Sequence, residues 1–221
     1  MVDESVPLQR WIAHVFDRPI TDPAWYWNSD LEYLDPGPTR TAELIAETYE
    51  RSVDLFAPFS DAQLNQAFWF SVGSDASNYM FALRDESLPW DLRRRAIRPF
   101  YPLFEQVMAT RCEPVLSHFD ETGANALNSA CYMWWDIIPI CSSRSVGGAA
   151  ALDNEALAVM ERILRIQHVA CQESALHGLG HWKFNHPEFV EKTIDEFLRR
   201  ESNLRRELVG YAKAAKTGCI Q

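Results

Sequence analysis

The chain has 221 residues, of which 47% are hydrophobic, so it can bury a large core and is not expected to be disordered. Its 31 acidic and 21 basic residues give a formal charge of −10, which argues against nucleic acid and anionic membrane surfaces as partners. Five cysteines occur without a C-x-x-C pair, so neither a disulfide framework nor a zinc knuckle is expected.

The opening residues, MVDESVPLQR, are acidic and lead into no apolar run, so they do not predict a signal peptide. No stretch approaches the 18 or so apolar residues that a membrane-spanning helix needs. We therefore expect a cytoplasmic protein that forms a single domain over residues 1–221.

The N-terminal part, about residues 1–140, has helical periodicity with irregular spacing. Leu8, Trp11, Ile12 and Val15 form one apolar stripe, and Ser60 with Gln63 forms a capping box. Pro99 and Pro102 should bend or break the helix in which they lie. The predicted helices cover residues 3–17, 39–56, 60–70, 89–108 and 125–138, with short ones near 79–83 and 114–119.

The C-terminal part, about residues 151–217, is more regular. Residues 141–152 predict a loop, and helices should start near Asp153, His168, Pro187 and Asn203, with Gly218 as a helix stop. The second helix pair begins 34 positions after the first, as in an α-solenoid. No hairpin dipeptide lies between alternating runs, so no strand is predicted. The fold class is therefore all-α, an α-α superhelix of about ten helices.

The segment SALHGLGHW, followed by a turn and a helix ending in IDEFL, resembles a HEAT-like unit over about the last 70 residues. This resemblance implies a right-handed solenoid that serves as a scaffold for protein contacts. One HEAT-like group excises alkylated bases from DNA, but that activity needs a basic surface and the charge of −10 departs from it. The segments CYMWWDIIP and ALHGLGHW also resemble those of uncharacterised bacterial proteins, a likeness that carries no activity.

The most unusual pattern lies in the predicted helix 168–184. Glu173, His177 and His181 are spaced i, i+4, i+8 and share one face, where two imidazoles and a carboxylate could bind a transition metal such as zinc. The alternative is that they are buried, hydrogen-bonded helix residues. Gly178 occupies the position where a metalloprotease motif has its glutamate, which excludes that class. Gly178 and Gly180 predict a close neighbour.

Three further groups are candidates for chemistry. Asp136 lies in an apolar run and is expected to be paired or functional, and either Asp136 or His186 could complete a metal site. Cys171 with a histidine could act as a nucleophile, although six residues place it on a different helix face from His177.

The absence of a complete catalytic motif favours a non-catalytic helical-repeat protein, without cofactor, that binds another protein or itself. Its candidate contact residues lie near predicted helix ends: Trp25, Trp27, Trp90 and Trp182. The alternative is a metal-dependent enzyme, a hydrolase, that uses the helix face of Glu173, His177 and His181.

Overall fold

The computed structural model describes residues 2–140, 148–200 and 203–220, and over these residues the chain is all-helical, without a strand. Short 3₁₀ turns lie at Trp25–Trp27, Tyr79–Arg84 and Ser117–Phe119. The α-helices are α1 (Leu8–Val15), α2 (Gly37–Glu50), α3 (Ser52–Phe56), α4 (Asp61–Val72), α5 (Trp90–Ile97), α6 (Phe100–Leu103), α7 (Ala109–Arg111), α8 (Ala126–Ile137), α9 (Gly148–Ile163), α10 (Val169–Trp182), α11 (Pro187–Arg200) and α12 (Arg206–Thr217).

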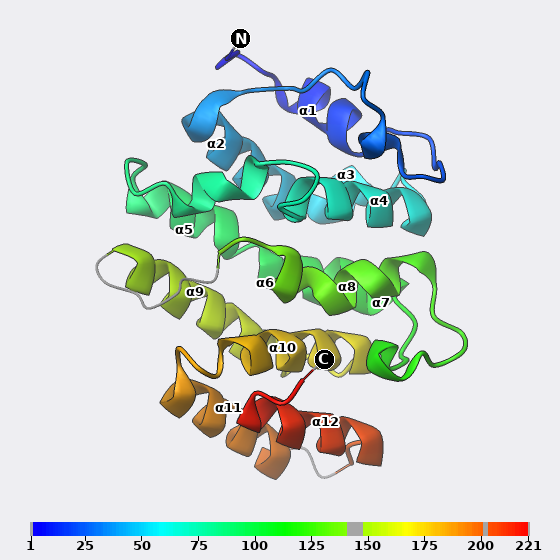
Figure 1. Cartoon of the computed structure of the whole chain (residues 1–221), viewed down its shortest axis with the longest axis vertical. Coiled ribbons are helices and arrows are strands. Elements are labelled where there is room, and N and C mark those ends of the chain that lie inside the picture. The colour runs from blue at the N-terminus through cyan, green and yellow to red at the C-terminus, as the bar shows by residue number, and fades with distance from the viewer. Residues whose placement is uncertain (1, 141–147, 201–202, 221) are drawn as a thin grey trace.

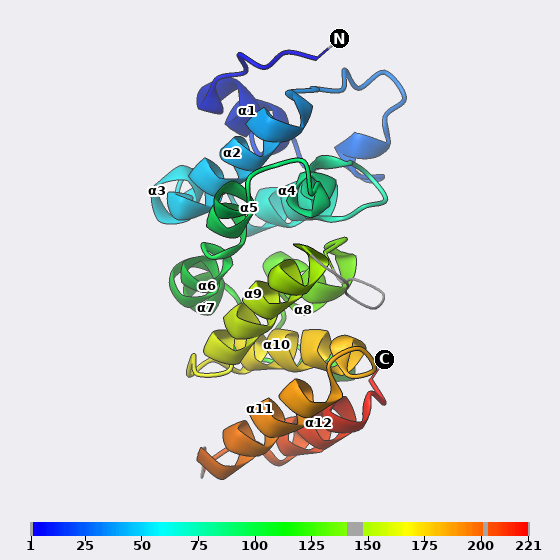
Figure 2. The same ribbon diagram turned by 90° about the vertical axis from the view of Figure 1, so that its left-hand side faces the viewer.

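The helices are stacked in layers along the long axis of the molecule, in the order of the chain (Figure 1). Helices α1 and α2 form one end, and α11 and α12 form the other, as the side view also shows (Figure 2). Helix α8 contacts α4 in one direction and α10 in the other. The layer of α8 therefore joins the two halves of the stack.

One continuous apolar core runs through the layers, with Trp134 of α8 near its centre. The Trp134 ring is fully buried and meets four aromatic rings edge-on, with centroids 5.2–5.8 Å apart. These rings belong to Tyr49, Phe68, Phe100 and Phe104. Edge-to-face contacts of this kind add to the burial of the rings themselves. The aromatic residues of the sequence are thus chiefly core residues.

The N-terminal helices differ from the expected ranges where the backbone is interrupted. The predicted helix 39–56 breaks at Arg51, whose φ of −113° and ψ of 21° separate α2 from α3. Pro99 interrupts the predicted helix 89–108 and separates α5 from α6, whereas Pro102 lies inside α6 and does not break it. A π-helical turn, Phe104–Met108, follows α6 directly. The first helix covers Leu8–Val15 rather than 3–17, while the Ser60–Gln63 capping box is confirmed.

Two C-terminal helix starts were predicted wrongly. Residues 141–147 of the predicted loop lie outside the described residues, but α9 already begins at Gly148, since the alanine-rich segment that follows favours helix. Asp153 is therefore a buried residue inside α9 rather than its cap. Helix α12 has Arg205 rather than Asn203 at its N-cap, and Gly218 ends it with a φ of 76°, as predicted.

Within residues 2–140, 148–200 and 203–220, every helix is too short or too polar to cross a bilayer.

Candidate functional site

Helix α10 is the most enclosed helix near the C-terminal end of the stack. From Ala170 to Trp182 every residue is buried except His181. The two glycines allow this enclosure: a Cβ atom on Gly178 would lie 2.5 Å from the Cβ of Trp135, and one on Gly180 would lie 2.8 Å from the Ile220 side chain. The close neighbours predicted for both glycines are therefore present, and α8 lies directly against α10.

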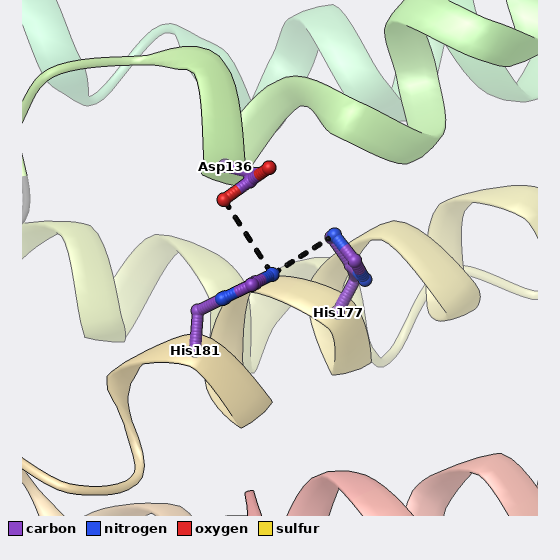
Figure 3. A group of neighbouring side chains, drawn as sticks. All are labelled: Asp136, His177 and His181. Atoms are coloured by element: carbon purple, nitrogen blue, oxygen red, sulfur yellow. Dashed lines mark hydrogen bonds and ion pairs between the residues drawn. The ribbon is translucent and has the colours of Figure 1, made fainter. Parts of the chain in front are cut away.

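Three polar side chains meet at the contact between α8 and α10 (Figure 3). Nε2 of His181 lies 3.2 Å from Nε2 of His177 and 3.5 Å from a carboxylate oxygen of Asp136. One ligand atom from each residue lies within 4.8 Å of the other two. Asp136 comes from α8 and the two histidines from successive turns of α10. We call this group the Asp–His–His cluster.

One side of the Asp–His–His cluster is buried in the protein, and the other side is exposed to solvent. His177 is 2% exposed, whereas the side chains of Asp136 and His181 are 37% and 40% exposed. A ligand held between the three groups would therefore be reachable from solvent.

A second layer of hydrogen bonds fixes the buried imidazole. Nδ1 of His177 lies 2.7 Å from the Tyr211 hydroxyl, which is 3.1 Å from the Tyr132 hydroxyl. Burial, with smaller effects of His181 and His118, lowers the pKa of His177 to about 3, so its ring is neutral near neutral pH. When Nδ1–H donates to Tyr211, the lone pair of Nε2 points into the cluster.

Glu173 does not join this cluster, although its spacing places it on the same face of α10. Its buried carboxylate accepts hydrogen bonds from the backbone N–H groups of Ser117 (2.8 Å) and His118 (3.0 Å), and it also contacts the His118 ring. It therefore fixes the 3₁₀ turn Ser117–Phe119 against α10. The structure places Asp136 beside the two histidines where the sequence suggested Glu173.

The remaining candidates for chemistry lie elsewhere. Nε2 of His186 is 2.9 Å from a carboxylate oxygen of Asp153, away from the cluster. Hydrogen bonds from Cys131 and His168 lower the pKa of Cys171 to about 7 in spite of its burial. The Cys171 thiol is nevertheless fully buried against the carbonyl of Phe104. A substrate therefore has no access to it in this conformation.

Of the four tryptophans suggested as contact residues, three are largely enclosed. Trp182 is fully buried, Trp25 is 9% exposed and packs on Phe70, and Trp90 is partly buried near Arg93. Trp27 is 58% exposed.

Trp27 and Asp136 line the same cleft, of about 320 Å³. The cleft places an exposed aromatic ring beside the Asp–His–His cluster. Sequence reasoning singled out both residues but could not place them together. It missed Tyr211 entirely, because a tyrosine on the apolar face of an amphipathic helix carries no distinguishing signal.

The chain matches no family model, no curated protein sequence and no solved structure, so its function is inferred from its own residues.

Proposed function

We propose that this protein binds a divalent transition metal ion through Asp136, His177 and His181, and that it uses the ion for hydrolysis. The observation that carries the proposal is the spacing of the ligand atoms. With zinc–ligand bonds of about 2.0–2.1 Å, two atoms of a tetrahedral site lie about 3.3 Å apart. The separations from Nε2 of His181, 3.2 Å to His177 and 3.5 Å to Asp136, fit two edges of such a site, and the ligand atoms of His177 and Asp136 lie within 4.8 Å of each other.

The chemistry of the donor set supports a catalytic rather than a closed structural site. Two imidazoles and a carboxylate are common zinc ligands in enzymes, and three protein ligands leave a fourth position for water. A zinc ion lowers the pKa of its bound water to about 7, which supplies a nucleophile near neutral pH. The half-exposed side chains of Asp136 and His181 leave the open position reachable. The supported class of reaction is therefore metal-assisted hydrolysis.

The expected role in protein contacts has less support. Figure 1 shows helices stacked in layers, and a right-handed HEAT-like superhelix remains our proposal for their arrangement. Among the four suggested contact tryptophans only Trp27 offers a large exposed surface. A scaffold role, with a protein partner or a second copy, is thus the second candidate.

Metal analysis of the purified full-length chain tests the proposal. After removal of metal with a chelator, titration with Zn²⁺ or Co²⁺ should reach one equivalent and raise the thermal stability. Cobalt should give the intense visible absorption of a tetrahedral site. His181→Ala removes a direct ligand, and Asp136→Asn replaces a carboxylate ligand by a neutral and weaker amide oxygen, so each should weaken binding by at least about tenfold.

Two matched variants serve as controls. Asp75→Asn changes a carboxylate in the neighbouring cleft, and His14→Asn changes a remote imidazole, so both should keep wild-type metal affinity. The same three groups could instead form a metal-free chain of hydrogen bonds. Wild-type protein that takes up no stoichiometric metal, or variants at Asp136 and His181 that bind like wild type, would refute the proposal in favour of that chain.

A further inference from the structure

The cleft beside Asp136 is built from three segments of the chain, residues 26–27, 69–76 and 136–137. Its walls include Tyr26 and Trp27 from the first 3₁₀ turn, Trp69 from α4, the connection 73–76, and Asp136 with Ile137 from the end of α8. A volume of about 320 Å³ lies at the lower end of the range for small-molecule sites. The cleft therefore suits a small ligand rather than a folded partner.

The lining of the cleft has an unusual composition. Three of its nine lining residues are aromatic, two are aspartates, and no lysine, arginine or histidine is among the described residues that line it. The rings of Tyr26 and Trp27 meet at 60° with centroids 5.2 Å apart, so they form two faces of a corner. The cleft thus combines aromatic faces with two negative charges.

This combination selects one kind of cation. Aromatic faces attract a positive charge through their quadrupole and cannot ligate a metal ion, so they favour a bulky, weakly hydrated cation. Asp75 and Asp136 supply charge complementarity, and the part of the chain that the structure describes gives Asp75 no cationic partner. Elsewhere in the molecule, the guanidinium of Arg18 already lies 5.1 Å from the Trp25 ring centroid, an internal example of the same contact.

We propose that this cleft binds a small organic cation with a quaternary ammonium group, held by Tyr26, Trp27 and Trp69 and balanced by Asp75 and Asp136. The contact would cover Trp27, which is 58% exposed without a ligand. This site shares Asp136 with the proposed metal centre but does not depend on it, since the aromatic corner and Asp75 lie outside the Asp–His–His cluster.

Calorimetric titration of the full-length, metal-free protein with choline at constant ionic strength tests the proposal. Choline should bind with a stoichiometry of one, and its neutral isostere 3,3-dimethylbutan-1-ol should bind at least about tenfold more weakly, because it lacks the charge. Trp27→Ala should weaken choline binding by about tenfold, and Asp75→Asn by about threefold. Both positions are exposed, so the variants should fold.

Tyr33→Ala is the matched control, since Tyr33 is a half-exposed aromatic residue in a different depression. It should bind choline like wild type. Three results would each overturn the proposal: no binding of choline to the wild-type protein, equal binding of the neutral isostere, or unchanged binding by Trp27→Ala. Because the titration uses metal-free protein, its outcome is independent of whether the Asp–His–His cluster holds a metal.

Discussion

Replacing Gly178 by alanine tests whether the close approach of α8 and α10 is as tight as the structure shows. The new Cβ atom would lie 2.5 Å from the Cβ of Trp135 and 2.8 Å from the sulfur of Met160. Carbon atoms in van der Waals contact lie about 3.5–4.0 Å apart, so a gap of about 1 Å must open. The methionine sulfur can rotate away, but the Trp135 Cβ moves only with the backbone of α8.

The net effect on stability follows from two opposing contributions. Alanine gains about 1 kcal/mol over glycine in a helix interior. Overpacking a tight core costs about 1–3 kcal/mol, and a backbone displacement places this site at the upper end. We therefore expect Gly178→Ala to destabilise the protein by about 2 kcal/mol, which lowers the Tm of a chain of this size by about 4–8 °C.

Urea denaturation followed by circular dichroism measures the change, with Gly210→Ala as the matched control. Gly210 lies inside α12, and a Cβ atom there meets no heavy atom within 4 Å. Gly210→Ala should therefore stabilise the protein by about 0.5–1 kcal/mol. If Gly178→Ala proves as stable as wild type, the tight contact of α8 with α10 does not exist. Separation of these helices should also weaken metal binding, because Asp136 and His181 lie on opposite sides of the gap.

Three further changes have defined outcomes. Glu173→Gln should destabilise the protein in denaturant titrations by about 2–3 kcal/mol, because an amide replaces a buried carboxylate that accepts several hydrogen bonds; a neutral effect would mean that Glu173 does not fix the 3₁₀ turn. Tyr211→Phe should weaken Co²⁺ binding by about tenfold through loss of the hydrogen bond to His177, and unchanged affinity would exclude that orienting role. Burial and Arg18 lower the pKa of His14 from 6.5 to about 4 in the folded protein. Between pH 6.5 and 4 the unfolded state therefore binds a proton at His14 more readily than the folded state does. The stability of the protein should fall as the pH drops through this range. After discounting for the partial exposure of the ring, we expect the free energy of unfolding to fall by about 1 kcal/mol over this pH range, and His14→Asn should abolish that fall. If the variant and the wild type lose stability equally as the pH drops, this role of His14 is refuted.

Local sequence patterns were sufficient to predict much of the helical structure. The capping box at Ser60 and the helix stop at Gly218 are interactions between residues within one turn of each other, so the order of the chain shows them directly. The helix boundaries that were predicted wrongly depend on contacts with residues far away in the sequence. Asp153 resembles a helix cap in sequence, but its carboxylate pairs with His186, 33 residues away, and the helix starts earlier.

The composition of the candidate site depends on contacts between distant residues even more than the helix boundaries do. The spacing of Glu173, His177 and His181 determined that all three lie on one face of α10, because a helix repeats every 3.6 residues. It could not determine which neighbour covers each turn of that face. The 3₁₀ turn at Ser117 covers Glu173, and α8 brings Asp136 to His181.

The amino-acid sequence by itself thus determined an all-helical chain and the helix face that carries the two histidines, since both follow from local periodicity and hydrogen bonding. The tertiary structure alone decided which carboxylate joins those histidines and which tryptophan stays exposed. The physical reason is that packing brings together side chains about 40 residues apart or more along the chain, and the positions of the helices around α10 are set by the summed contacts of the whole core.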